Sequence, residues 1–355
     1  MRIWSVAPLA AAIVGASGGS AFCDSATRIS GPHAYENLAV YFVHGQSAPG
    51  PVPLTLEEAL AKNAVQVIET DRVNELQIEN VGSEPVFIQS GDIVKGGKQD
   101  RVLTVSLLLV PNSGRMPIAS FCVEQGRWSA RGGEEAARFS SAREAMPSMS
   151  ALLAMSAPPV EAHAAREGLE LAQRRAFDPD EVADRQRKVW DAVANTQRKL
   201  SSGLKASVAS PRSTSSLQLS LENEKLREAR AAYLSALRPT GEKDADIVGY
   251  VVAINGQMRA ANVYPSNTLF RKMWEKQLAA AVTESIGDKA AATPATAAPA
   301  PPTAGEFLAN AEKGKAYGRA LAAGMRQETR DADGSLYNEA RGADGNWIHR
   351  SYLAK

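Results

Sequence analysis

The chain has 355 residues, of which 44% are hydrophobic and 22% are charged, a balance typical of a globular protein with one large or two ordinary domains. Its 40 lysine and arginine residues nearly balance 39 aspartate and glutamate residues, for a formal net charge of +1. This balance argues against broad nucleic-acid binding, because such binding depends on an excess of positive surface charge.

The first 23 residues have the layout of a secretory signal peptide. Arg2 is the only charged residue before Asp24, a short apolar run begins at Ile3, and small residues follow it. Neither this run nor any later one approaches the roughly 20 apolar residues that a membrane span needs. We therefore predict cleavage after Ala21 or Cys23 and a bacterial protein that is periplasmic or secreted. The alternative is an uncleaved N-terminal helix.

The two cysteines, Cys23 and Cys122, leave two interpretations open. They form a disulfide if cleavage leaves Cys23 in an exported chain, or Cys23 is lost and Cys122 is a buried strand thiol. The four histidines are scattered singly, so the sequence shows no zinc-type cluster. We predict neither a metal nor a cofactor.

Residues 37–128 are predicted to form a β-rich block. Short apolar or alternating runs are separated by turn residues, and the short connections favour antiparallel pairing. Thr55 and Glu58 have the spacing of a capping box, which predicts a short helix up to about Asn63. The predicted strands are 37–44, 65–69, 76–80, 85–89, 102–110 and 116–123.

The middle of the chain is predicted to be helical. Residues 129–177 show weak periodicity and are expected to run largely as surface loop, with a short helix left open at 140–155, where the prolines at 147, 158 and 159 limit it. Asp178 then has the position of a helix cap, with Pro179 at the first helical position and Glu181 three residues after the cap. The helices are expected at 178–200 and 217–237.

A hairpin and a helix are predicted to follow. Strands at 247–254 and 257–263 flank Asn255-Gly256, a dipeptide that favours a tight hairpin turn. A helix is expected after Ser266, with its end at Gly287. We therefore predict an α+β fold with an antiparallel β-rich N-terminal half, a helical middle, and a closing β-hairpin plus helix.

Composition divides the chain into four predicted segments. They are a signal peptide at 1–23, a single α+β domain at 29–287, an Ala/Pro-rich linker at 288–305 and a small helix-hairpin tail at 306–355. Within the tail we predict a helix at 306–325 and strands at 336–340 and 346–352. A tail of this size is too small to be stable alone, so we expect it to dock on the main domain or on a protein partner.

The stretch from Ser90 to Trp128 gathers the residues that are capable of chemistry. If strands 102–110 and 116–123 pair, the polar residues before the first strand meet those after the second. The predicted catalytic residues are Glu124 and Arg127, and the predicted ligand-binding residues are Lys98, Gln99, Arg101, Gln125 and Trp128. We call these seven residues the central patch.

The glycines before the patch leave two interpretations open. The segment lacks the Gly-Lys-Ser/Thr ending of a phosphate loop, because Gly97 is followed by Lys98 and Gln99 and then by a strand. Gly96 and Gly97 either present backbone N–H groups to an anion or form a plain turn beside solvated basic side chains.

The side chains of the patch are open to two interpretations as well. Arg127 has the fork geometry that binds carboxylate or phosphate, and Trp128 either stacks a ligand ring or belongs to the core. Glu124 is either a general base or the ion-pair partner of Arg127 or Lys98. Cys122 is either a nucleophile or a bystander.

Five segments in this order resemble a known family. They are GDIVKGGKQDRVL, FCVEQGRW, VWDAV, SLQLSLEN and GYVVAINGQMRAANVYPSNTLF. Together they are similar to the ARG and rhodanese-phosphatase-superfamily-associated protein domain. The resemblance covers about residues 29–285, leaves the linker and tail outside, and is most specific around Lys98 and Arg127.

The resemblance implies a single α+β domain of uncharacterised activity. The family's association with ADP-ribose-type and phosphatase-type enzymes implies a role near NAD-derived or phosphorylated nucleotides. The residues that match its polar pattern are Lys98, Gln99, Arg101, Glu124, Arg127 and Trp128.

Three functions remain open from the sequence. The first is an exported module that binds an anionic or nucleotide-like ligand at the central patch. The second is a hydrolase or transferase for ADP-ribose-like or phosphate-ester substrates, with Glu124 as general base and Arg127 and Lys98 stabilising transition-state charge. The third is a structural or interaction protein of the cell envelope, in which the patch is a buried salt-bridge network.

Overall fold

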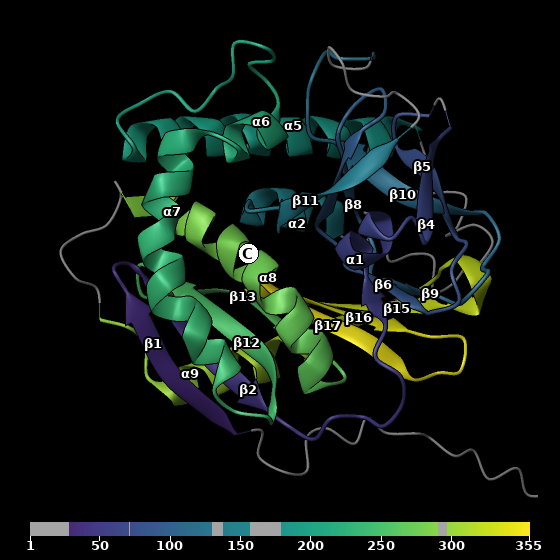
Figure 1. Ribbon diagram of the computed structural model, residues 1–355. Coiled ribbons are helices and arrows are strands. Elements are labelled where there is room, and N and C mark those ends of the chain that lie inside the picture. Colours follow the sequence, from purple (N-terminus) through teal and green to yellow (C-terminus); the bar gives the residue numbers. More distant parts are fainter. Residues whose placement is uncertain (1–27, 71, 130–137, 157–178, 290–296) are drawn as a thin grey trace, which may run out of the picture.

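The computed structural model describes residues 28–70, 72–129, 138–156, 179–289 and 297–355. The described strands form sheets of eight, six and three strands. Helices pack between and around these sheets (Figure 1). The α+β class, the antiparallel β-rich N-terminal half and the helical middle are therefore confirmed.

The eight-stranded sheet joins the two ends of the described chain. Every neighbouring pair in it is antiparallel. Its strands in spatial order are β1 (Ile29–Tyr35), β2 (Leu38–His44), β12 (Ile247–Ile254), β13 (Gln257–Val263), β17 (Trp347–Ala354), β16 (Ser335–Arg341), β15 (Arg326–Ala332) and β14 (Lys315–Ala320).

Helices cover both faces of this sheet at its first strands. In β2 the side chains alternate: Val40 and Phe42 join the core beneath α8 (Asn267–Asp288), whereas Tyr41 joins the core beneath α9 (Pro301–Ala311). All seven residues of β2 are buried for this reason. Figure 1 shows α8 in front of the sheet, with α7 beside it.

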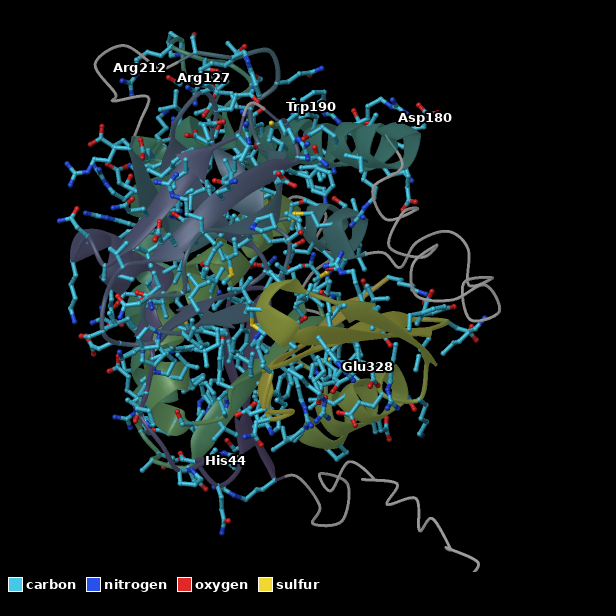
Figure 2. All side chains as sticks on the ribbon, turned by 90° about the vertical axis from the view of Figure 1, so that its right-hand side faces the viewer. His44, Arg127, Asp180, Trp190, Arg212 and Glu328 are labelled. Carbon is cyan, nitrogen blue, oxygen red and sulfur yellow. The ribbon has the colours of Figure 1, made fainter. Side chains whose placement is uncertain are left out.

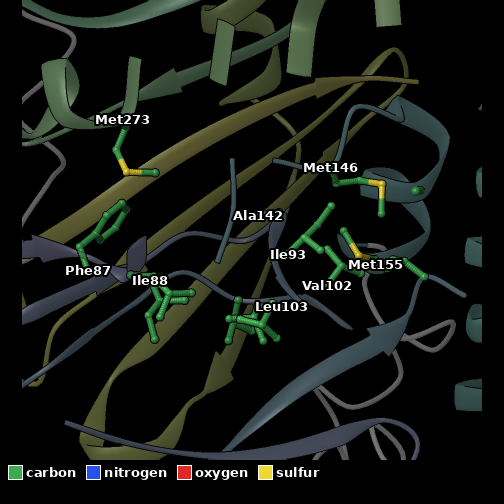
Figure 3. Packing of buried hydrophobic residues seen from close by; sticks show 14 of the residues in the cluster. Phe87, Ile88, Ile93, Val102, Leu103, Ala142, Met146, Met155 and Met273 are labelled. Atoms are coloured by element: carbon green, nitrogen blue, oxygen red, sulfur yellow. The ribbon is translucent and has the colours of Figure 1, made fainter. Parts of the chain in front are cut away.

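The other two sheets carry the N-terminal half. The six-stranded sheet contains β11 (Phe139–Ala145), β7 (Asp92–Gly96), β8 (Arg101–Leu103), β10 (Met116–Cys122), β5 (Glu75–Asn80) and β4 (Val65–Glu69) in spatial order. The three-stranded sheet contains β3 (Leu54–Thr55), β6 (Val86–Ile88) and β9 (Leu107–Leu109), with β3 and β6 parallel. One core joins the sheets to the helices, as Phe87, Ile93, Val102, Met155 and Met273 show (Figure 3).

The remaining helices are α1 (Leu56–Ala61), α2 (Met149–Ser156), α5 (Pro179–Gly203), α6 (Leu217–Leu221) and α7 (Glu224–Leu237), with the 3-10 turns η1 (Arg238–Glu242) and η3 (Ala322–Gly324). The capping box of α1 is confirmed: the Thr55 side chain accepts from Glu58 N, and the Glu58 side chain accepts from Thr55 N. The Asn255-Gly256 turn is confirmed too, since both residues have positive φ.

Several predicted elements were wrong in detail. The strand expected at 102–110 is two strands in different sheets, because Thr104 and Ser106 cross between them and bond to Ser90. Strand β11 lies in a segment that was expected to be loop. It is a strand because its backbone pairs antiparallel with β7, which was not predicted either.

The helical predictions also need correction. The helix expected at 217–237 is divided, because the Asn223 side chain caps a new helix by accepting from Leu226 N. Helix α8 continues through Gly287 to Asp288. A Cβ at Gly287 would lie 3.3 Å from Lys199 Cβ, so this glycine marks a close approach to α5 rather than a helix stop.

The tail has more strand than the sequence predicted. The helix expected at 306–325 ends at Ala311, and β14 follows it. The predicted linker segment includes the start of α9 at Pro301. Because β17 pairs with β13, the tail continues the main sheet. The predicted signal peptide, Cys23, Asp178 and residues 290–296 of the predicted linker lie outside the described residues.

Candidate functional site

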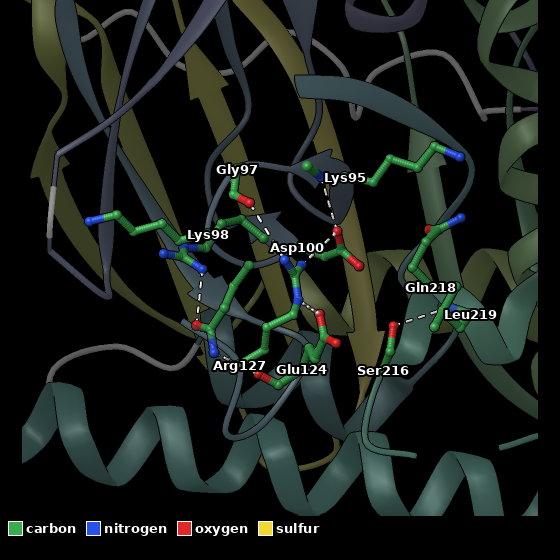
Figure 4. Close-up of polar contacts among 12 residues, drawn as sticks. Lys95, Gly97, Lys98, Asp100, Glu124, Arg127, Ser216, Gln218 and Leu219 are labelled. Atoms are coloured by element: carbon green, nitrogen blue, oxygen red, sulfur yellow. Dashed lines mark hydrogen bonds and ion pairs between the residues drawn. The ribbon is translucent and has the colours of Figure 1, made fainter. Parts of the chain in front are cut away.

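The pairing of β8 with β10 assembles the central patch. Their register places Arg101 opposite Cys122, and Val123 N donates to Asp100 O at 3.1 Å. The loop before β8 and the loop after β10 therefore lie side by side (Figure 4). This confirms that Lys98 and Arg101 lie at the same end of the strand pair as Glu124 and Arg127.

Arg127 is at the centre of the patch. Its Nε donates to Glu124 Oε2 at 2.6 Å, its Nη2 lies 3.5 Å from Asp100 Oδ1, and its Nη1 approaches Gly97 O at 3.5 Å (Figure 4). The Glu124 and Asp100 side chains are fully buried, and only 10% of the Arg127 side chain is exposed. Arg127 thus compensates two buried carboxylates at once.

Arg101 and Gln99 form a second layer of contacts. Arg101 Nη1 donates to Gln99 Oε1 at 3.1 Å, and Gln99 Nε2 donates to the Glu124 carbonyl at 3.0 Å. Arg101 Nη2 lies 3.6 Å from Glu69 Oε2. Sequence reasoning did not place Glu69 in the site, because it comes from β4, which no local pattern connects to β8.

The glycine loop does gather backbone N–H groups around carboxylates, but these belong to the protein itself. Gly96 N donates to Asp100 Oδ1 at 3.0 Å, and Lys98 N donates to Glu69 Oε1 at 3.2 Å. Gly97 has a φ of +57°, which turns the loop back on itself. These two N–H groups are therefore already used and are not available for an external anion.

Trp128 and Lys98 form the outer surface of the patch. Trp128 is 42% exposed, so it does not belong to the core. Lys98 Nζ lies 5.3 Å and Arg101 Cζ 5.4 Å from the centre of the Trp128 ring, within cation–π range. Gln125 is exposed, and its backbone carbonyl accepts from Ser215 Oγ at 2.7 Å.

Several buried polar atoms beneath this surface have no hydrogen-bond partner in the described part of the chain. Among the described residues Arg101 Nε has no ion-pair contact either, whereas Arg101 Nη2, Arg127 Nη2 and Glu69 Oε2 make only the ion-pair contacts of 3.5–3.6 Å given above. Buried polar atoms are nearly always bonded to protein or water, so Arg101 Nε calls for a water or ligand acceptor at this place.

The sequence model of the ARG and Rhodanese-Phosphatase-superfamily-associated Protein domain matches residues 26–353. The chain belongs to this family. The match is longer than the resemblance at 29–285 and includes the tail, in agreement with the pairing of β17 with β13. Comparison with curated proteins and comparison with solved structures gave no match.

Cys122 of this family member is unsuited to nucleophilic attack. It is a buried free thiol, its Sγ contacts Val73 O at 3.5 Å, and burial raises its pKa to about 11. The thiol is protonated at neutral pH, whereas attack requires the thiolate. The pairing with Cys23 lies outside the described residues.

One group among the described residues has metal-ligand spacing: His44, Asp244 and Asp246. The Arg28 guanidinium lies 2.6 Å from both His44 Nδ1 and Asp246 Oδ2, so a cation already compensates this group. His44 lies at the opposite end of the molecule from Arg127 (Figure 2). No helix in the described ranges combines the length and apolarity of a membrane span.

Proposed function

We propose that this protein is an exported module that binds a small anionic, nucleotide-like ligand at the central patch. The observation that carries the proposal is the buried Arg101 Nε, which has no hydrogen-bond partner among the described residues and lies beneath the exposed Trp128. Arg101 Nη2 and Arg127 Nη2 make only ion-pair contacts to acidic side chains, at 3.6 Å and 3.5 Å. A phosphate or carboxylate group supplies the acceptor oxygens that arginine binds best. The face of Trp128 suits a stacked base, and Lys98 lies beside it.

Export is the part of the proposal that rests on the sequence alone. Arg2, the short apolar run after it and the small residues up to Ala21 support it. N-terminal sequencing of the protein recovered from a periplasmic or culture fraction tests it. Recovery of the intact N-terminus from the cytoplasm only would contradict export.

A structural role for the patch is the main competing function, and one observation favours it. Three acidic residues, Glu69, Asp100 and Glu124, contact the two arginines or the glycine loop, so much of the charge is compensated internally. Such a network fixes the two loops against each other without any ligand.

The hydrolase or transferase alternative has less support. Glu124 is fully buried, and one of its oxygens accepts from Arg127 Nε at 2.6 Å, whereas a general base must reach the substrate proton. If Glu124→Gln abolishes a turnover measured on ADP-ribose-like or phosphate-ester substrates, this alternative replaces the binding module.

Thermal unfolding of the protein against a ligand panel tests the proposal. The panel contains ADP-ribose, NAD, nucleotide mono- and diphosphates, inorganic phosphate and divalent metals. A ligand at a hundred times its dissociation constant adds about 2.7 kcal/mol, which is a shift of roughly 2–4 °C for a chain of this size.

Trp128→Ala and Lys98→Ala are the decisive variants, because these side chains are exposed or partly exposed and contribute little to the core. We expect both to reduce the ligand shift, while the exposed Lys225→Ala on α7 leaves it unchanged. The absence of a midpoint shift with every ligand would reject this site and favour the structural role. So would a ligand shift in both patch variants equal to that of the unchanged protein.

A further inference from the structure

A cavity of about 260 Å³ lies where α2, α5 and α8 meet β13, well apart in sequence from the central patch. Figure 1 shows α2 and α5 near one end of α8. The cavity is lined by Ser148, Thr196, Lys199, Arg259, Glu284 and Asp288, which come from α5, β13, α8 and the turn before α2. We call it the Glu284 cavity.

The positive charge that lines the cavity exceeds the negative charge of its one ion-paired carboxylate, Asp288. Lys199 Nζ lies 2.7 Å from Asp288 Oδ1, and Arg259 Nη2 lies 3.2 Å from Asp288 Oδ2. One carboxylate therefore accepts from two cations. Arg259 Nε is buried and has no hydrogen-bond partner in the described ranges, so the guanidinium retains an unused donor.

Glu284 faces these cations from α8. Its Oε1 accepts from Met149 N, the first residue of α2, at 3.0 Å. Burial chiefly raises the pKa of Glu284 to about 7, assisted by the charge of Asp288 and opposed by the Met149 N–H, Arg259 and Lys199. The remaining charged residue that lines the cavity is Lys355, whose Nζ pairs with Asp331.

A smaller cavity of about 60 Å³ adjoins the first and shares Met149 and Glu284 with it. Gln277 lines this smaller cavity, is 6% exposed, and has an Nε2 without a hydrogen-bond partner in the described chain. Its Oε1 accepts from Tyr250 OH at 3.3 Å, which fixes the orientation of the amide. A residue with an unused buried donor thus lines the same small cavity as Glu284, which suits a ligand with acceptor atoms.

We propose that the Glu284 cavity is a second ligand site, which binds a small molecule carrying a carboxylate or phosphate group through Lys199 and Arg259. Arg259 Nε donates to no protein oxygen in the described ranges, and an oxygen of such a group supplies its acceptor. Gln277 Nε2 is available to a part of the ligand that extends into the adjoining cavity. Neutral Glu284 donates its proton to the anion, whereas ionised Glu284 repels it.

The proposal predicts a pH dependence with a definite sign. Because the pKa of Glu284 is about 7, its neutral form predominates at pH 6 and its ionised form at pH 8. If only the neutral form binds, affinity falls roughly tenfold from pH 6 to pH 8, in proportion to the neutral fraction.

Sulfate and acetate are suitable probes, because the charge of neither changes between pH 6 and pH 8. Thermal unfolding of the full chain is measured with each anion against chloride at matched ionic strength, so that general screening cancels. We expect both anions to raise the midpoint at pH 6 and to act more weakly at pH 8. A larger effect of sulfate indicates a phosphate-bearing ligand, and a larger effect of acetate indicates a carboxylate.

Four variants make the test specific. Glu284→Gln keeps an acceptor for Met149 N and is expected to bind equally at both pH values. Arg259→Gln is expected to lose the anion effect, with the exposed Arg212→Gln as its matched control. If Arg259→Gln does not fold, the half-exposed Lys199→Gln replaces it.

Two results would overturn the proposal. One is the absence of any stabilisation by sulfate or acetate beyond that of chloride at pH 6. The other is an effect that persists in Arg259→Gln and Lys199→Gln but disappears in Trp128→Ala, since the anion then binds at the central patch. An effect that survives Trp128→Ala separates this site from the proposed function.

Discussion

Arg127 shows how one side chain can make a cluster of buried charges tolerable. It contacts Glu124 at 2.6 Å and Asp100 at 3.5 Å, and both carboxylates are shielded from water. Each carboxylate is costly to bury, and the cost is offset only while a cation and hydrogen bonds remain in place. The residue therefore matters to stability whether or not a ligand binds.

We predict that Arg127→Ala lowers the free energy of unfolding by about 3–5 kcal/mol, because it removes the arginine from two buried carboxylates. Urea unfolding followed by far-UV circular dichroism measures the change. The exposed Arg212→Ala is the matched control, with an expected change within about 0.5 kcal/mol. A loss below about 1 kcal/mol in Arg127→Ala would show that water reaches these carboxylates readily.

The loop between β7 and β8 depends on glycine at one position above all. Gly97 has a φ of +57°, and a Cβ there would lie 2.3 Å from Phe139 Cζ and 2.6 Å from Glu69 Oε1. The loop can therefore close on β11 and on Glu69 only if residue 97 has no side chain. This closure allows Lys98 N to donate to Glu69.

Gly97→Ala is expected to destabilise the protein by about 2–3 kcal/mol, from the overlap with Phe139 together with the strain of a positive φ. The matched control is Gly334→Ala in the turn between β15 and β16, where a Cβ would meet no atom within 4 Å. Urea midpoints of the two variants are compared with that of the unchanged protein. Equal midpoints would mean that the loop relaxes without cost.

At the scale of the whole molecule, the tail is part of the main sheet. Strand β17 pairs with β13, and α9 covers Tyr41 and Val251 on the face opposite α8. The tail thus buries residues from both halves of the chain. This arrangement agrees with the family match, which extends to residue 353.

A chain that ends at residue 300 is therefore expected to aggregate or to lose cooperative unfolding. Its β13 edge is unpaired and the apolar face beneath α9 is exposed. Size-exclusion chromatography and thermal unfolding measure this, with the chain that lacks only residues 1–27 as the reference. A soluble monomer with an unchanged midpoint would show that the tail is dispensable.

The parts of the site that sequence predicted are those joined by short connections. Lys98 and Arg101 meet Glu124 and Arg127 because β8 and β10 are close in sequence and pair with each other, although the connection between them includes β9 of another sheet. Glu69 was missed, because it reaches Arg101 through the order of strands in a six-stranded sheet. The Glu284 cavity was missed for the same reason, since no sequence pattern near Glu284 predicts that Lys199 or Arg259 lines the same cavity.

The sequence by itself determined the local elements: the capped helix at Thr55, the Asn255-Gly256 turn, strand 247–254 and the α+β class. Each depends on side-chain periodicity or on the conformational preference of one or two residues, which neighbours along the chain supply. Only the tertiary structure decided which charged side chains are buried and with which partners they form ion pairs. Burial and ion pairing arise between strands and helices far apart in sequence, so the same arginine can hold a ligand or a buried carboxylate depending on what the fold places beside it.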